Sequence, residues 1–148
     1  ATTEIYTLSL HDALPIYLLR DRPGIETLFS VEADHAALDC ARTHVTDPRA
    51  QFIWSDARIW TPPAPLSSVV MNPPFHTARA ADPALGQAFI ANAARILSGS
   101  GRLWLVANRH LPYEATLTNL FRDVSELGGD SRFKVLHAQR PKSKKSRA

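Results

Sequence analysis

The chain has little cysteine, and it lacks any long apolar run. Cys40 is the only cysteine among 148 residues, which excludes an internal disulfide and indicates a reducing compartment. We interpret Cys40, which lies on a predicted helix, as a small core residue rather than a nucleophile. No run of about 18 or more apolar residues occurs, so the sequence predicts no membrane-spanning helix. The six histidines are scattered without the spacing of metal ligands, and no metal site is expected.

The excess of positive charge is also small. Lysine and arginine number 17 against 14 aspartate and glutamate residues, which gives a net charge of +3 and a sequence pI of about 9.4. This balance permits a nucleic-acid partner without requiring one. With 45% hydrophobic and 21% charged residues, a chain of 148 residues is typical of one globular domain with a single core.

The pattern of apolar residues predicts alternating strands and helices. Asp34 is expected to cap the first predicted helix. Such alternation is typical of an α/β fold, in which a mostly parallel sheet is covered on both faces, here with an antiparallel C-terminal hairpin. We expect strands over 27–32, 51–54, 66–71 and 102–107, helices over 34–45, 82–97 and 112–121, and hairpin strands over 124–127 and 132–138.

The most informative stretch is Asn72-Pro73-Pro74-Phe75. It follows the apolar run 68–71 and precedes a polar segment, which predicts a rigid turn after a buried strand. Both prolines fix φ and lack an N–H, and Pro73 pushes Asn72 toward an extended conformation. The Asn72 side-chain oxygen and nearby carbonyls are thus held beside the Phe75 ring. An ordinary Asn-Pro turn is the alternative interpretation.

These fixed acceptors suit a planar group that carries an NH2, such as the amino edge of a base. An exocyclic amino nitrogen is a poor nucleophile because its lone pair is delocalised into the ring. Two acceptors on its N–H bonds favour a pyramidal nitrogen whose lone pair turns toward an electrophile, while Phe75 stacks on the base. Positioning and oriented dipoles suffice for this chemistry, without a metal or a covalent intermediate.

Two acids follow other predicted strands. Ligands of parallel sheets bind beyond the carboxyl ends of the strands, where Glu32, Asp56 and Asn72 would lie together. An acid after the second strand can accept hydrogen bonds from a ribose diol, and Asp56 can accept one from an adenine amino group. The alternatives are helix capping for Glu32 and Asp34, and an ordinary loop acid for Asp56.

The order of these residues resembles that of the class I S-adenosylmethionine-dependent methyltransferases, which have a Rossmann-like core. Within this class the chain is similar to the ribosomal RNA guanine-N2 methyltransferase family of the small-subunit type, over roughly residues 17–141. The stretches that carry the closer resemblance are Asn72-Pro-Pro-Phe-His76, Val106-Ala-Asn-Arg-His-Leu-Pro-Tyr113 and Arg132-Phe-Lys-Val135.

This resemblance implies S-adenosylmethionine as the cofactor and guanine N2 of ribosomal RNA as the acceptor. It also implies ribosomal RNA or the small ribosomal subunit as the partner, a cytoplasmic location, and neither membrane nor metal. The implied residues are Asn72, Pro73, Pro74 and Phe75 for catalysis, Glu32, Ala33, Asp56, Ala57 and Asn72 for the cofactor, and His76, Arg109, His110 and Lys134 for RNA.

The chain departs from the family pattern at its start. The family opens with a strand and a glycine-rich turn that lets the backbone approach the methionine part of the cofactor. Residues 1–16 contain no glycine, although 4–10 alternate well enough to replace the first strand. They also resemble translated sequencing-adaptor segments. We therefore expect a non-family leader over 1–16, a truncated catalytic domain without its native first strand and glycine-rich loop over 17–140, and a basic disordered tail over 141–148.

Three other interpretations stay open. The same four-residue motif serves N-methyltransferases that act on DNA adenine or on protein glutamine. The absent glycine turn favours a catalytically silent RNA-binding module, which would present Arg109, Lys134 and the basic tail to RNA. The third is an incomplete fragment with neither activity, because losing the native first strand removes the centre of the sheet.

Overall fold

The computed structural model describes residues 4–8, 13–74, 76–77 and 80–142. Phe75 and the tail from residue 143 onward lie outside the described residues, as does the side chain of His76. The described residues form a seven-stranded sheet and a separate two-stranded ribbon.

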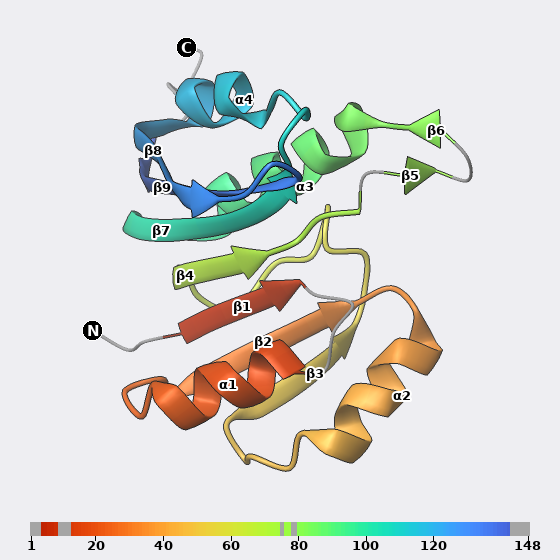
Figure 1. Cartoon of the computed structure of the whole chain (residues 1–148). Helices are drawn as coiled ribbons and strands as arrows, with labels where there is room; N and C mark the ends of the chain where they lie inside the picture. The colour runs from red at the N-terminus through yellow and green to blue at the C-terminus, as the bar shows by residue number, and fades with distance from the viewer. Residues whose placement is uncertain (1–3, 9–12, 75, 78–79, 143–148) are drawn as a thin grey trace.

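The main sheet has the strand order β3-β2-β1-β4-β7-β9-β8 (Figure 1). β1 to β4 and β7 pair in parallel, whereas β9 pairs antiparallel with both β7 and β8. This arrangement confirms the predicted α/β class, with a mostly parallel sheet and an antiparallel C-terminal hairpin. The strands are β1 (Glu4–Leu8), β2 (Thr27–Glu32), β3 (Ala50–Trp54), β4 (Leu66–Met71), β7 (Leu97–Asn108), β8 (Phe121–Gly129) and β9 (Phe133–Pro141), and the ribbon pairs β5 (His76–Thr77) with β6 (Ala80–Ala81).

β1 lies in the interior of the sheet, between β2 and β4. Ile5 pairs with Leu28 of β2 on one side and with Ser68 of β4 on the other. The strand expected within residues 4–10 is thus present and occupies the place of the expected first strand. The helix that follows, α1 (Ala13–Asp21), is not among the predicted elements, and it extends across the boundary expected after residue 16.

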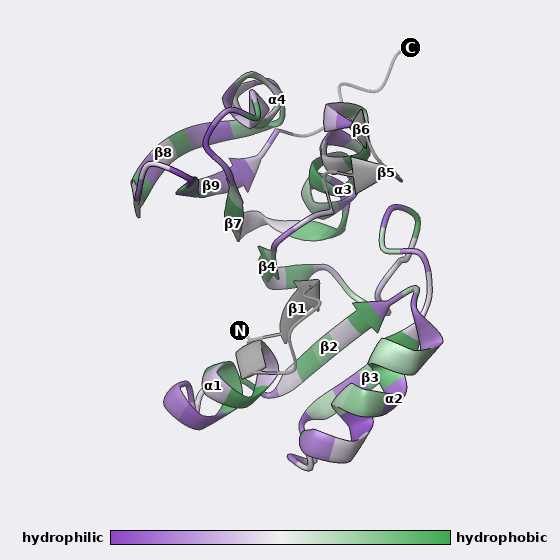
Figure 2. Cartoon of the chain, turned by 45° about the vertical axis from the view of Figure 1, so that its right-hand side comes forward, coloured by the Kyte–Doolittle hydropathy of each residue, from purple (hydrophilic) through white to green (hydrophobic). Residues whose placement is uncertain are grey.

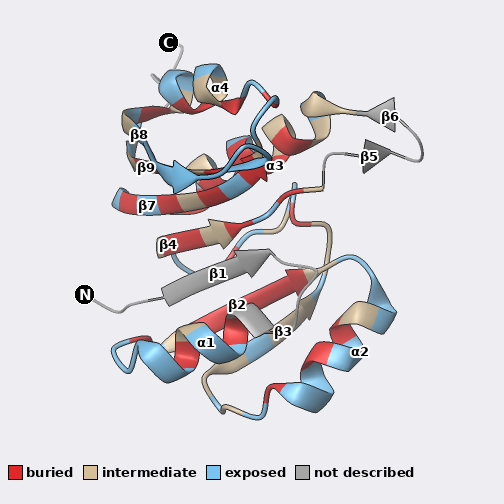
Figure 3. Ribbon diagram, in the orientation of Figure 1, coloured by how far each residue is buried: buried red, intermediate tan, exposed pale blue. Residues whose placement is uncertain are grey.

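Helices cover both faces of the sheet. α1 and α2 (His35–His44) lie on one face, and α3 (Pro83–Ile96) and α4 (Tyr113–Leu120) lie on the other (Figure 1). Buried residues run along β2, β4 and β7 between these layers (Figure 3). The larger core cluster includes Val69, Ile90, Ala93, Leu103 and Leu117, and a smaller one beneath α1 joins Leu19, Ile25, Leu28 and Val45.

Asp34 caps α2, as predicted. Its carboxylate accepts hydrogen bonds from the backbone N–H groups of Ala36, at 2.9 Å, and Ala37, at 3.3 Å. Hydrophilic and hydrophobic residues alternate along α2 (Figure 2), and Leu38 is fully buried. The prediction that Cys40 is a core residue was wrong, because its side chain is exposed. It follows Leu38 by two residues, which turns it about 200° around the helix from that buried position.

β7 begins earlier than predicted. It starts at Leu97, directly after α3, so residues 98–101 belong to a strand rather than to a loop. The register between β4 and β7 shifts here, since Leu66 pairs with Leu97 while Ser68 pairs with Arg102. Such a bulge accommodates extra residues in one strand without ending the ladder.

Candidate active site

The carboxyl ends of β2, β3 and β4 meet at one edge of the sheet (Figure 1). Glu32 ends β2 and pairs with Trp54 of β3, and Asn72 directly follows β4. Since only β1 separates β2 from β4, the backbones of Glu32 and Asn72 lie two strand spacings apart, about 10 Å. The structure therefore places the predicted cofactor residues and the predicted catalytic turn along one edge.

Glu32 is partly buried at this edge. Its Oε1 accepts a hydrogen bond from the backbone N–H of Asp34 at 2.9 Å, which holds the carboxylate by one oxygen. Part of the capping alternative for Glu32 is thus present, because the bond steadies the chain just before α2. A carboxylate fixed at one oxygen can still accept a hydroxyl donor at the other.

Asp56 shapes the loop after β3. Its carboxylate accepts a hydrogen bond from the Arg58 backbone N–H at 2.9 Å and forms an ion pair with the Arg58 guanidinium at 2.6 Å. The side-chain hydrogen bonds from Arg58 hold the pKa of Asp56 below its ordinary value, although burial opposes them. These contacts are the ones expected if Asp56 is an ordinary acid that stabilises its own loop, which is the alternative interpretation given above. An adenine amino group would share the carboxylate with Arg58.

The adjacent Ala57 is buried and is held by α3. The Asn92 side-chain amide donates to the Ala57 carbonyl at 2.7 Å and to the Trp60 carbonyl at 3.1 Å. Arg95 donates to the Asn92 Oδ1 at 2.8 Å and to the same Trp60 carbonyl at 2.9 Å. These hydrogen bonds between α3 and the loop after β3 were not predicted from the sequence. Their signal is Asn92 on the apolar face of a helix, beside Ala93, where a polar side chain requires partners.

Trp54 is a second residue of this edge that was not predicted from the sequence. Its side chain is 64% exposed at the end of β3, and its Nε1 donates to the Ala33 carbonyl at 3.0 Å. The His35 ring meets the indole edge-on, with 5.0 Å between the ring centres. These contacts fix a flat aromatic surface next to Glu32. Such a surface suits the stacking of an adenine base.

The predicted catalytic turn emerges directly from β4. Met71, the last residue of that strand, is buried, and Asn72 is exposed. Pro73 is buried and Pro74 is partly buried, so the turn is anchored at Pro73 while Asn72 faces solvent. This exposure is what a side chain needs if it is to accept hydrogen bonds from a ligand.

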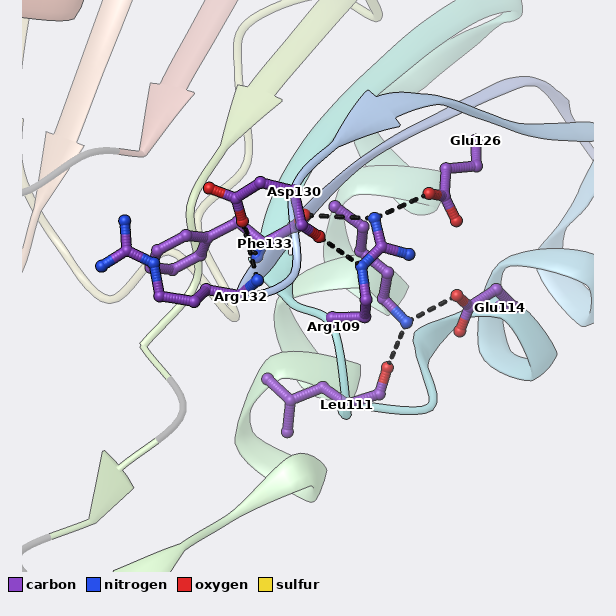
Figure 4. Close-up of polar contacts among 8 residues, drawn as sticks. Arg109, Leu111, Glu114, Glu126, Asp130, Arg132 and Phe133 are labelled. Carbon is purple, nitrogen blue, oxygen red and sulfur yellow. Dashed lines mark hydrogen bonds and ion pairs between the residues drawn. The ribbon is translucent and has the colours of Figure 1, made fainter.

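Arg109 follows β7 and ties that edge to the turn between β8 and β9 (Figure 4). Its Nε donates to the Asp130 carbonyl at 2.6 Å, and its Nη2 forms an ion pair with Glu126 at 3.0 Å. The same Nη2 also donates to the Phe133 carbonyl at 3.3 Å. The Arg109 side chain, 40% exposed, therefore combines a structural role with access to solvent. The neighbouring His110 is exposed.

Lys134 is buried. The residue is 3% exposed, and its Nζ donates to the Leu111 carbonyl at 2.7 Å and to the Glu114 carboxylate at 2.5 Å (Figure 4). Burial has the largest single effect and raises the pKa of Glu114, but the hydrogen bond from Lys134, a backbone hydrogen bond and the charges of Lys134 and Arg109 together lower it below its ordinary value. This position argues against the RNA contact expected of Lys134, because its charge is held between β9 and the loop before α4.

Within the described ranges no group of three or more histidine, cysteine, aspartate or glutamate residues is placed to hold a metal ion. No helix among the described residues is both long and apolar enough to cross a membrane.

Comparisons with known proteins identify the family of the chain. Residues 13–137 match the family model described as Methyltransferase small domain. Ribosomal RNA large subunit methyltransferase G of Streptomyces coelicolor is 34% identical over 119 residues, which cover 78% of the chain and 32% of that relative. Ribosomal RNA small subunit methyltransferase C of Idiomarina loihiensis is 39% identical over 70 residues, covering 47% of the chain and 21% of the relative.

A solved structure supports the same class. The 16S rRNA N2 G1207 methyltransferase of T. thermophilus, in complex with AdoMet and guanosine, superposes with a TM-score of 0.77 at 29% identity. The match covers 93% of the chain and 37% of that protein. The chain thus spans about a third of the length of this protein and of the Streptomyces relative. The predicted Rossmann-like methyltransferase core is confirmed.

Proposed function

Because the chain belongs to the methyltransferase small domain family, we propose that it transfers a methyl group from S-adenosylmethionine to guanine N2 of ribosomal RNA. The observation that carries the proposal is the place of Asn72-Pro73-Pro74, directly after β4 and on the edge shared with Glu32. The proposed partner is ribosomal RNA, free or within the small ribosomal subunit, in the cytoplasm. The relatives are named as methyltransferases of large-subunit and of small-subunit ribosomal RNA, which supports RNA as the substrate class.

The described residues fit the adenosine part of S-adenosylmethionine. Glu32 would accept hydrogen bonds from the ribose hydroxyls, and Asp56 and Ala57 would meet the adenine edge. The exposed Trp54 ring, fixed through the Ala33 carbonyl, offers that base a stacking surface. When bound, S-adenosylmethionine supplies an electrophilic methyl group.

Asn72 and Pro73 would position the acceptor. The Asn72 side-chain oxygen and the Pro73 carbonyl each accept one N–H of the guanine amino group, and this favours a pyramidal nitrogen with its lone pair free. Phe75 would stack on the base. The guanine must be unpaired for these contacts, because its amino group is otherwise engaged in the helix. The methyl–sulfur bond of the cofactor would break as the new nitrogen–carbon bond forms, the demethylated cofactor would leave, and the nitrogen would lose one proton to solvent.

Asn72→Ala tests this mechanism. Removing one of the two acceptors should lower the rate of methyl transfer to ribosomal RNA about 100-fold or more, by analogy with the loss of one oriented dipole from an active site. Affinity for S-adenosylhomocysteine should change by no more than about threefold, since the adenosine contacts lie elsewhere.

The measurement is tritiated methyl transfer, with Asn119→Ala on the exposed side of α4 as the matched control. A fully active Asn72→Ala enzyme would refute the proposed role. Offering ribosomal RNA, DNA and protein side by side also tests the other amino acceptors, DNA adenine and protein glutamine.

The absence of glycine from residues 1–16 favours a second candidate, a catalytically silent RNA-binding module. Calorimetric titration separates the two functions. Binding of RNA without any binding of S-adenosylmethionine or its demethylated product would support the silent module.

A further inference from the structure

An exposed aromatic ring lies at the turn between β8 and β9. The Phe133 side chain, at the first position of β9, is 41% exposed. The guanidinium carbon of Arg132 lies 5.8 Å from the centre of that ring, within the range of a cation–π contact. No carboxylate in the part of the chain that the structure describes forms an ion pair with Arg132. The turn thus presents a flat apolar face and a positive charge side by side.

The turn is held rigidly. The Asp130 carboxylate accepts hydrogen bonds from the backbone N–H groups of Arg132, at 2.7 Å, and Phe133, at 2.8 Å. The Asp130 N–H in turn donates to the Phe133 carbonyl at 2.8 Å. Arg109 holds the same loop from the other side through the carbonyls of Asp130 and Phe133 (Figure 4). Because the turn is already ordered, it would lose little conformational entropy when a ligand binds.

Its position relates it to the proposed catalytic turn. Phe133 pairs with Asn108 of β7, whereas Met71, just before Asn72, pairs with Leu105. Only β7 separates β4 from β9, so the backbones of Phe133 and Asn72 lie about 12 Å apart, from two strand spacings and two residues of rise. An extended single strand of RNA covers that span within a few nucleotides.

We propose that Phe133 and Arg132 form a stacking platform for a nucleotide that flanks the methylated guanine in single-stranded RNA. This inference rests on the proposed function. Every base has a π face, so Phe133 accepts any base by stacking. The planar, permanently charged Arg132 guanidinium binds a backbone phosphate. Duplex RNA would not fit, because its bases are stacked on one another and hidden from the ring.

The local charges favour an anionic ligand over a neutral protein surface. The three acids of this hairpin are occupied, because Asp130 accepts backbone N–H groups, Glu126 pairs with Arg109 and Asp123 pairs with Arg140. Among the described residues no acid neutralises Arg132, and its positive charge suits an anionic ligand. RNA offers a base and a phosphate together, which matches a ring and a guanidinium in contact.

The test is equilibrium binding of a fluorescein-labelled single-stranded oligonucleotide of ribosomal RNA sequence, followed by anisotropy. Phe133→Leu, which keeps an apolar side chain but loses the ring, should weaken binding about tenfold. Phe133→Tyr should bind like the unchanged chain. Arg132→Gln should reduce the slope of log affinity against log salt by about 1. Leu127→Ala is the matched control, since Leu127 is 58% exposed on the same hairpin.

Each outcome decides the inference independently of the proposed function. Unchanged RNA affinity in Phe133→Leu would overturn the platform, even if the unchanged chain methylates RNA. A tenfold loss in Phe133→Leu would support it, even if no methyl transfer is found. Sedimentation gives a third arm. If the unchanged chain dimerises and Phe133→Leu is monomeric with undiminished RNA affinity, the ring belongs to a contact between copies and the inference fails.

Discussion

The buried ammonium group of Lys134 stabilises the fold by satisfying a buried carbonyl. Its side chain is 4% exposed, and its Nζ donates to the carbonyl of the buried Leu111. Lys134→Met keeps most of the apolar stem but leaves that carbonyl without its donor, which should lower the free energy of unfolding by about 1–3 kcal/mol. The partner Glu114 contributes little to this loss, because its side chain is 46% exposed and water replaces the ion pair.

Urea unfolding followed by circular dichroism measures this effect. The control is Lys142→Met, because the Lys142 Nζ donates to the Thr118 carbonyl at 2.7 Å in an exposed setting. Its stability should stay within about 0.5 kcal/mol of the unchanged chain. Equal stability of the two variants would contradict the interior role of Lys134. A lower salt slope of RNA binding in Lys134→Met would instead restore the phosphate contact first expected of it.

At the scale of single residues, only part of the candidate site could be predicted from the sequence. Glu32, Asp56 and Asn72 could be placed at one edge, because strand ends follow from the apolar pattern and a parallel sheet aligns them. Lys134 and Trp54 could not be placed, since a lysine near the start of a strand and a tryptophan at a strand end look the same in the sequence whether buried or exposed. Their burial depends on which helix covers which face, and that is decided by the tertiary structure.

The hairpin of β8 and β9 depends on one backbone conformation. Gly129 has φ of 142°, where side chains are strained, and a Cβ there would lie 2.2 Å from the Phe133 carbonyl oxygen and 3.0 Å from the Arg109 Nη2. Gly129→Ala should therefore destabilise the fold by about 1–3 kcal/mol. It should also weaken RNA binding, because the turn that carries Phe133 must move.

Gly128→Ala provides a control one residue away. A Cβ at Gly128 meets no atom within 4 Å, so stability should change by no more than about 0.5 kcal/mol. Thermal unfolding and amide hydrogen exchange at Arg132 and Phe133 measure the effect on each variant. Equal protection of these two amides in both variants would show that the turn tolerates a side chain at Gly129.

At the scale of elements, strong patterns led to correct predictions and weak ones did not. The strands over 27–32 and 66–71 were predicted with the observed limits, because both are short apolar runs between clear turn signals. α1 was not predicted, although Pro15 is compatible with it, because a proline in the first turn of a helix costs no hydrogen bond. β7 was shortened because the glycine and serine residues 98–101 suggested a loop.

Across the whole molecule, the position of β1 decides whether a complete sheet can form. A strand from a segment without glycine pairs with β2 and β4 and joins the two halves of the sheet. The edge that bears Glu32, Asp56 and Asn72 depends on this junction, because β1 sets the distance between the proposed cofactor residues and the proposed catalytic turn. A chain with this sheet should bind the adenosine part of the cofactor through residues after β2 and β3.

We therefore expect S-adenosylhomocysteine to bind the chain and to raise its stability. At a concentration 100 times its dissociation constant, the gain in unfolding free energy should be about 2.7 kcal/mol. Glu32→Gln should weaken binding about tenfold, because it removes the charge from the hydrogen bonds to the ribose. Glu26→Gln, an exposed acid before the opposite end of β2, should leave binding unchanged.

Calorimetry and thermal unfolding measure these effects, and they separate two properties of the molecule. A folded chain that gains no stability from the ligand would show that the sheet edge is insufficient without a glycine turn after β1. Equal binding by Glu32→Gln and the unchanged chain would place the ribose away from β2. If the unchanged chain and Glu26→Gln bind the ligand and Glu32→Gln binds it more weakly, the adenosine contacts do not require a glycine turn. The reason is that residues 1–16 contain a strand but no glycine.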